Sequence, residues 1–182
     1  MRSFALVLLL SSLASSQTAV PPAKPRVSVY CNQDLGYCFD YPASWKMLGE
    51  VYEGHGATVA PVQQGDSSQW AQVTVAAIDI PTSEGKDAPS LEDLVTTLVG
   101  KMAEQTSKME TVRRSQETLA HHSAQLFQVH YDEGGKRWGE TIVAMDGGNG
   151  TFYTVVYKAL ADDEAKYKTQ VEGILKSFRL KP

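Results

Sequence analysis

The chain of 182 residues is 42% hydrophobic and 21% charged, which is typical of a globular protein with one well-packed domain. Its 17 Lys and Arg residues are outnumbered by 21 Asp and Glu residues, and the net charge is −4. Nucleic-acid binders usually carry a basic surplus, so this balance argues against a nucleic-acid partner. The sequence has no apolar run of about 20 residues, which argues against several membrane-spanning helices.

The N-terminus has the layout of a secretory signal peptide over residues 1–19. Arg2 precedes an apolar run from Phe4 to Leu10, and small residues follow. Because the run is too short to span a bilayer comfortably, we expect it to be cleaved rather than kept as an anchor. The mature protein would then be periplasmic or extracellular, without stable membrane insertion. Cleavage is expected after one of three small residues: Ala14, Ser16 or Ala19.

Residues 20–26 form a short Pro-rich segment, VPPAKPR, which cannot join a helix or a central strand. We interpret this segment as an extended tether between the cleavage site and the folded part of the chain. A single domain is expected over residues 27–182.

Cys31 and Cys38 flank the segment NQDLGY, in which Asp34 and Gly36 are turn-forming residues. Apolar and aromatic residues on each side predict a hairpin in which the two cysteines lie opposite each other. A disulfide is the favoured interpretation, because an even cysteine count in an exported protein supports pairing. A redox pair usually has C-x-x-C spacing and a zinc site needs two further ligands, so these alternatives are weaker.

The first half of the domain is predicted to be rich in strands. The hairpin formed by residues 27–31 and 37–41 is followed by strands at 46–52 and 56–62. The longest stretch, WAQVTVAAIDI at 70–80, is largely apolar on both faces. This pattern predicts a strand that is covered on both sides.

A helix is expected to begin after Ser90, a good N-cap whose spacing to Asp93 resembles a capping box. Apolar residues recur at helical spacing from Leu91 to Met102 and fall on one face. The solvated side of this helix is expected to carry three charged residues: Lys101, Glu104 and Lys108.

Three further strands are predicted at 124–131, 138–145 and 151–160. The glycine-rich turns 132–136 and 146–150 separate them, which predicts an antiparallel meander.

A last amphipathic helix is expected to be capped by Asp162 and Asp163, with an apolar stripe from Tyr167 to Phe178. Two amphipathic helices together with hairpin-linked strands predict an α+β fold. The expected architecture is an antiparallel β-sheet sandwiched between helices.

Two segments resemble motifs of the PsbP-like superfamily. GYCFDYPASW at 36–45 is similar to the opening motif of that family, which has a Gly–aromatic start, a Phe, a Tyr-Pro pair and a Trp. GILKSFRL at 173–180 is similar to its closing helix with a Ser-Phe pair, and the order of elements in between also matches. The matching residues look like core and turn positions: Phe39, Tyr41, Pro42, Trp45 and Phe178.

The resemblance implies an α/β/α sandwich with an antiparallel sheet and no shared catalytic residues. The superfamily includes an extrinsic subunit of photosystem II, a nuclear import factor that binds a small GTPase, and many exported bacterial proteins. These members bind or stabilise larger partners, so the resemblance also implies a binding role.

The polar residues form no recognisable catalytic or metal-binding pattern. His121 and His122 would point to opposite faces of a strand, and His122 and His130 would lie roughly 27 Å apart at strand rise. We therefore expect exposed polar histidines and no metal site. No cofactor is expected either, because the glycine clusters lack the Lys and Ser/Thr of a phosphate-binding loop. The serines lack the context of a nucleophile elbow.

Aromatic residues are numerous for one small sheet, and Tyr and Trp are enriched at protein interfaces. We take Tyr52, Tyr131 and Trp138 as candidate partner-binding residues. Together with the export signal and the resemblance, they predict an exported, non-catalytic binding or assembly module that acts on a protein partner in the cell envelope. Two alternatives stay open: a small-ligand or lipid carrier with a cleft beside the sheet, and an enzyme with an unrecognised site.

Overall fold

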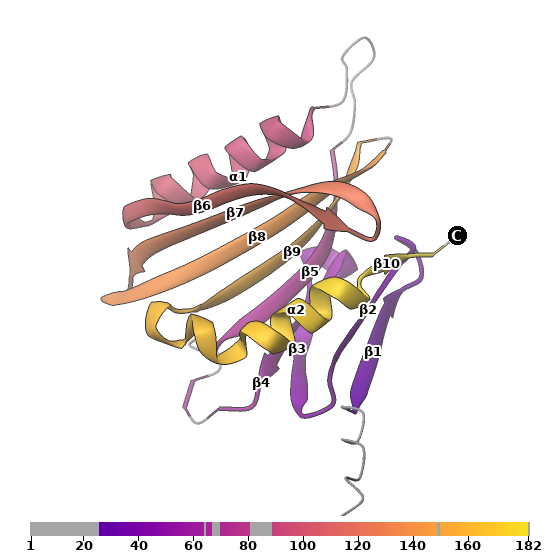
Figure 1. Ribbon diagram of the computed structural model, residues 1–182, viewed down its shortest axis with the longest axis horizontal. Coiled ribbons are helices and arrows are strands. Elements are labelled where there is room, and N and C mark those ends of the chain that lie inside the picture. The colour runs from indigo at the N-terminus through magenta and orange to yellow at the C-terminus, as the bar shows by residue number, and fades with distance from the viewer. Residues whose placement is uncertain (1–25, 64, 67–69, 81–88, 149, 182) are drawn as a thin grey trace, which may run out of the picture.

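Short turns join most successive strands of this protein, so the strands pair antiparallel (Figure 1). The computed structural model describes residues 26–63, 65–66, 70–80, 89–148 and 150–181. The expected signal peptide lies outside the described residues, as does the expected tether apart from Arg26.

The largest layer is a seven-stranded antiparallel sheet with the strand order β3-β4-β5-β9-β8-β7-β6. Neighbours in this order are mostly neighbours in the chain, as expected for hairpin-linked strands. The strands are β3 (Trp45–Val51), β4 (Gly56–Pro61), β5 (Gln72–Asp79), β6 (Ser107–Leu119), β7 (His122–Glu133), β8 (Lys136–Gly148) and β9 (Thr151–Leu160).

The two faces of this sheet are covered differently. One face carries α1 (Leu91–Gln105), and the other carries α2 (Lys168–Ser177) together with a second sheet of three strands (Figure 1). The small sheet has the order β1-β2-β10 and consists of β1 (Val27–Asn32), β2 (Tyr37–Pro42) and β10 (Arg179–Leu180). The predicted α+β fold is confirmed, with the N-terminal hairpin in a small second sheet that also contains β10.

The β1–β2 hairpin forms as predicted. Its register places Cys31 opposite Cys38, and a disulfide joins them with their Cα atoms 4.1 Å apart. In the turn, the Asn32 side-chain oxygen accepts hydrogen bonds from the backbone N–H groups of Asp34 and Leu35, at 3.1 and 3.0 Å. The turn chemistry and the covalent bond therefore stabilise the same hairpin.

The start of α1 also confirms its sequence pattern. Ser90 Oγ accepts a hydrogen bond from the Asp93 N–H at 3.2 Å, and the Asp93 carboxylate accepts one from the Ser90 N–H at 3.1 Å. These reciprocal bonds satisfy backbone donors at the first turn. The helix ends at Gln105, however, so Lys108 lies in β6 rather than on the helix.

Strand β6 is the main departure from the predicted elements, because it extends the expected three-stranded meander to four strands. Its sequence, SKMETVRRSQETL, has polar residues on both faces and lies at the edge of the sheet. It therefore lacks the alternation by which half-buried strands are recognised. After β6, Ala120 and His121 adopt φ values of 48° and 68°, so His121 lies in a tight turn and not in a strand with His122.

The C-terminal helical region begins as a 3₁₀ segment, η3 (Ala161–Tyr167), before α2 starts at Lys168. Tyr167 is buried where the two segments join, and its ring packs edge-on against Trp45 with centroids 6.0 Å apart. The predicted single helix is therefore shorter, although its apolar stripe still faces the core at Val171 and Ile174.

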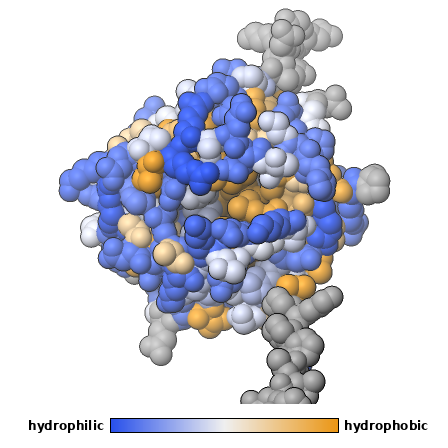
Figure 2. Space-filling view, in the orientation of Figure 1, coloured by the Kyte–Doolittle hydropathy of each residue, from blue (hydrophilic) through white to orange (hydrophobic). Residues whose placement is uncertain are grey.

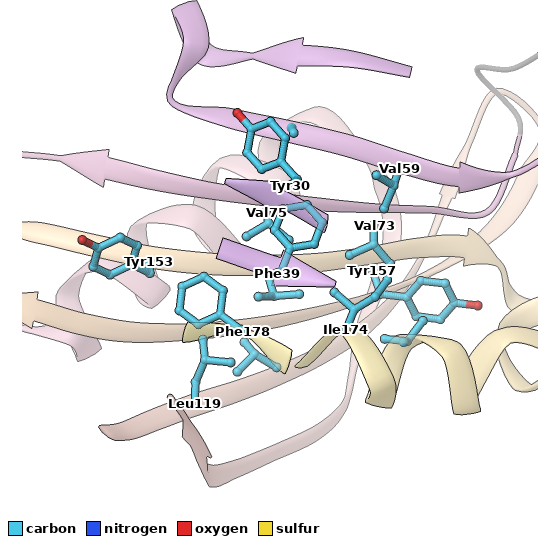
Figure 3. Close-up of a cluster of buried hydrophobic side chains, with 14 of the residues drawn as sticks. Tyr30, Phe39, Val59, Val73, Val75, Leu119, Tyr153, Tyr157, Ile174 and Phe178 are labelled. Atoms are coloured by element: carbon cyan, nitrogen blue, oxygen red, sulfur yellow. The ribbon is translucent and has the colours of Figure 1, made fainter. Parts of the chain in front are cut away.

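The main core lies between the large sheet and the layer formed by α2 and the hairpin (Figure 3). On the side seen in Figure 2, hydrophobic residues gather in a recess surrounded by hydrophilic ones. Tyr37 and Phe39 are fully buried, and the Phe178 ring stacks on Tyr37 with centroids 5.8 Å apart. Phe39, Trp45 and Phe178 are all buried, which confirms the core positions implied by the resemblance.

Gly56 faces β5 where no side chain fits. A Cβ at this position would lie 2.6 Å from the Ala76 Cβ and 2.7 Å from the Val75 carbonyl oxygen. We expect Gly56→Ala to lower the free energy of unfolding by about 1–3 kcal/mol through overpacking. The control is Gly100→Ala on α1, where no atom lies within 4 Å, and helix propensity should raise stability by about 1 kcal/mol. Urea denaturation followed by circular dichroism would measure both, and equal effects would contradict the packing argument.

The Cys31–Cys38 disulfide closes a short loop. In the chain-entropy model, closing such a loop stabilises the folded state by about 2.5 kcal/mol. We expect the double variant Cys31→Ala with Cys38→Ala to lose roughly this free energy of unfolding. Urea denaturation of the variant and of the oxidised protein would measure the difference. Unchanged stability would show that the hairpin is held by its noncovalent contacts alone.

Candidate binding surface

Helix α1 covers only part of its face of the large sheet. Its Val95 packs in a cluster with Phe127, Tyr131 and Trp138 from β7 and β8. Beside the helix, β5 and β9 border a cleft of about 350 Å³, which we call the α1 cleft. Its lining includes Leu98, Lys101 and Met102 of α1, Thr74 of β5, Glu140 and Ile142 of β8, Thr154, Val156 and Lys158 of β9, and Tyr52.

Strand alternation decides which side chains reach this cleft. On β9, Thr154 lines the cleft whereas Val155 belongs to the main core on the other face. On β5, Thr74 lines the cleft between the fully buried Val73 and Val75. We predicted that β5 is covered on both sides. Only the valine side is fully covered, because α1 does not extend over Thr74.

Tyr52 stands at the rim of the α1 cleft, in the short turn η1 (Tyr52–Gly54) between β3 and β4. It is 66% exposed. Tyr52 and Glu53 adopt φ values of 50° and 55°, in the left-handed region that is unfavourable for residues with a Cβ. Such strained positions cluster at binding and catalytic sites. Of the three aromatic residues proposed from the sequence, Tyr52 is the one that is exposed, and it borders the α1 cleft.

Tyr131 and Trp138 lie beneath α1 instead of on the surface. Tyr131 is only 2% exposed and Trp138 only 5%. They are cross-strand neighbours on β7 and β8, and they pack in the same cluster as Val95. The structure therefore gives them a supporting place behind the cleft, and neither ring is presented to a partner.

These two rings position a carboxylate and an ammonium group of the cleft lining. The Tyr131 hydroxyl donates a hydrogen bond to the Glu140 carboxylate at 2.7 Å. The Lys158 Nζ lies 4.7 Å from the centroid of the Trp138 ring and 2.7 Å from the Glu133 carboxylate. Burial raises the pKa of Glu140, and the hydrogen bond from Tyr131 and the positive charge of Lys158 partly oppose this shift. One end of the cleft thus combines opposite charges on an aromatic support.

Sequence reasoning missed Glu140, Thr154 and Lys158. A signal for them exists, because each is a polar residue on an otherwise apolar face of its strand: Glu140 lies between Trp138 and Ile142, and Thr154 and Lys158 lie on either side of Val156. In a sheet covered on both faces, such residues mark the face that is incompletely covered. The α1 cleft is that incompletely covered face.

A second cleft, of about 840 Å³, lies between the β1–β2 hairpin and α2. Val27 and Pro42 line it from the hairpin, and Gly173 and Ile174 line it from α2. Gln170 also lines it, and its buried side-chain oxygen has no hydrogen-bond donor among the described residues. We call this the hairpin cleft.

His130 is half-buried and paired, whereas we expected exposed histidines. Its Nε2 lies 2.6 Å from a Glu164 carboxylate oxygen, and Gln128 donates a hydrogen bond to the other oxygen at 3.1 Å. The carboxylate lies over Gly139, where any Cβ would overlap it. Within the described ranges, no three His, Cys, Asp or Glu side chains are grouped so that they could hold a metal ion. No helix in the described part of the chain is long and apolar enough to cross a membrane.

Comparison with known families agrees with this architecture. The family model for PsbP matches residues 25–180, so the chain belongs to the PsbP family. None of the curated proteins matches the sequence.

Solved structures with the same fold come from distant organisms. LpqN of Mycobacterium tuberculosis, involved in cell envelope biogenesis, has 14% identity and a TM-score of 0.60, over 87% of this chain and 92% of its own. Cyanobacterial PsbP of Synechocystis sp. PCC 6803 has 13% identity and a TM-score of 0.57, over 91% and 98%. The Ran-binding protein Mog1p of Saccharomyces cerevisiae has 8% identity and a TM-score of 0.56, over 86% and 96%. At these identities the likeness establishes a shared fold.

The raised pKa of Glu140 makes a prediction about stability and pH. Burial favours the protonated acid of Glu140 in the folded state. Its contribution to the free energy of unfolding is therefore complete below the ordinary pKa of a glutamate and is lost as pH rises through the raised pKa of the folded state. We expect Glu140→Gln to be more stable than the natural protein at neutral pH. This advantage should shrink as pH falls toward 4.5, the ordinary value for a glutamate.

The measurement is urea denaturation of both proteins at several pH values. The exposed Glu104→Gln on α1 serves as the control and should show no comparable pH-dependent gain. A stability difference that grows toward low pH would contradict the burial of Glu140.

Proposed function

We propose that the protein is an exported, non-catalytic module that binds a protein partner in the cell envelope through the α1 cleft. The observation that carries this proposal is Tyr52, an exposed aromatic residue held by a strained backbone at the rim of a cleft. Aromatic residues beside a partly apolar cleft are typical anchors of protein interfaces.

Export is supported by two features of this chain. Residues 1–19 have the layout of a signal peptide, and the Cys31–Cys38 disulfide belongs to an oxidising compartment. A role in the envelope is supported by analogy with LpqN, which is involved in cell envelope biogenesis. Mog1p, which binds Ran, shows that a protein of this fold can bind another protein.

A small-ligand or lipid carrier is the second candidate. The hairpin cleft supports it, because a volume of about 840 Å³ is within the range of small-molecule sites. Native mass spectrometry of the exported protein would separate the candidates. A co-purifying mass that is lost on Gly173→Trp, which would fill the hairpin cleft, would favour the carrier.

The binding proposal predicts that a photo-crosslinking amino acid at position 52 captures a discrete partner in intact cells. The same amino acid at position 112 is the control, since Val112 is exposed on β6 away from the cleft. We expect a specific cross-linked band at position 52 and none of the same mass at position 112. Identical patterns at both positions would argue against the α1 cleft.

Once that partner is purified, Tyr52→Ala should weaken its binding by about 30-fold, the equivalent of about 2 kcal/mol at an interface hot spot. Isothermal titration calorimetry would measure the dissociation constants. Val112→Ala should leave the affinity within about twofold of the natural protein. An unchanged affinity for Tyr52→Ala would remove the residue on which the proposal depends.

A further inference from the structure

Strand β1 lies at the edge of the three-stranded sheet, on the outer side of the molecule (Figure 1). The Arg26 carbonyl accepts a hydrogen bond from the Ala43 N–H at 3.0 Å, which continues the β1–β2 register. Every second residue after Arg26 therefore bonds to β2. The alternate residues, Val27, Val29 and Cys31, point their backbone N–H and C=O groups to the outer edge. No strand in the described part of the chain pairs with this edge.

This edge lacks the features that normally prevent strands from pairing. The edge strand β6 is irregular in register and carries charged residues such as Arg113 and Glu117, and the edge strand β3 has a bulge between Met47 and Gly49. By contrast β1, with the sequence VSVYCN, has an unbroken register and no charged residue. An uncharged, regular edge is a template for another strand.

The outward face of β1 is apolar. Val27 and Val29 are each 54% exposed, more than most large hydrophobic residues of the described chain. They lie on the same face as Cys31, whose disulfide to Cys38 fixes one end of the strand. Backbone groups and apolar side chains are therefore both available along one strand.

The two ends of β1 carry opposite charges. Arg26 is exposed at its start. At its other end, a hollow of about 390 Å³ is lined by three carboxylates together with the last residues of β1. These carboxylates belong to Asp34, Glu50 and Glu53.

We infer that β1 pairs antiparallel with β1 of a second copy of this chain, about a two-fold axis at Val29. In this register the outer-edge residues bond to one another. Val29 lies opposite Val29 of the second copy, and Val27 lies opposite its Cys31. The two small sheets then form one continuous antiparallel sheet across the dimer.

Charge complementarity favours a second copy as the occupant. In the same register, Arg26 lies opposite Asn32 of the other copy, and the two side chains are on the same face of the continuous sheet. This position borders the hollow lined by Asp34, Glu50 and Glu53. The two-fold symmetry repeats this contact at the other end of the paired strands, and no like charges face each other along them.

The inference does not depend on the proposed function. The α1 cleft lies on the opposite face of the large sheet from the β1–β2 hairpin, so a partner and a second copy can bind at once. A six-residue strand buries little area. The dimer is therefore weak, with a dissociation constant in roughly the micromolar range or above.

Sedimentation velocity of the exported protein, purified without reductant, tests the dimer over micromolar to millimolar concentrations. The expected result is a monomer–dimer equilibrium. Val29→Lys brings two ammonium groups together at the axis and weakens the dimer by at least roughly tenfold. The matched control is Val112→Lys, the same change at an exposed valine of β6, and it leaves the equilibrium unchanged.

A charge exchange tests the register independently. Arg26→Glu weakens the dimer, and adding Glu53→Arg to it restores part of the lost association. Circular dichroism of each variant establishes that it is folded. A monomer at every concentration, or a dimer that Val29→Lys leaves intact, overturns the inference. A photo-crosslinker at position 29 that captures a different protein, and never a second copy, overturns the choice of occupant.

Discussion

The packing of three aromatic rings from distant parts of the chain organises this protein. Tyr37 of the N-terminal hairpin is fully buried, and Phe178 reaches it from the end of α2 and stacks on it. Tyr153 of the large sheet completes the contact, with its ring centroid 5.9 Å from that of Phe178. Because this cluster joins the hairpin, the last helix and the sheet, the order of the layers depends on it.

This arrangement leaves the two faces of the large sheet unequal. The hairpin and α2 together cover one face, whereas α1 alone covers part of the other. The uncovered part lies over β5 and β9. There the threonines Thr74 and Thr154 face the cleft, whereas the neighbouring valines of the same strands face the main core. The α1 cleft is therefore a direct consequence of how many elements pack on each face. It needs no specialised loop beyond the turn that carries Tyr52.

The fold was largely predictable because its signals are local or periodic. The Cys31–Cys38 hairpin, the Ser90 cap and the apolar stripe of the last helix each depend on neighbours in sequence. Burial depends instead on tertiary contacts: Tyr131 and Trp138 are as aromatic as Tyr52, yet α1 covers them and leaves Tyr52 exposed. Strand β6 was missed for a related reason, since an edge strand with polar residues on both faces carries no periodic pattern.

The turn η1 borders both the α1 cleft and the acidic hollow at the end of β1. Tyr52 of this turn lines the α1 cleft, while Glu53 lines the acidic hollow at the end of β1. The Asn32 side chain donates a hydrogen bond to the Gly54 carbonyl at 2.7 Å, so the end of β1 is tied to the turn. The left-handed backbone at Tyr52 and Glu53 directs the two neighbouring side chains to these different surfaces. The hydrogen bond between Asn32 and Gly54 therefore holds the end of β1 against the turn whose first residue, Tyr52, forms the rim of the α1 cleft.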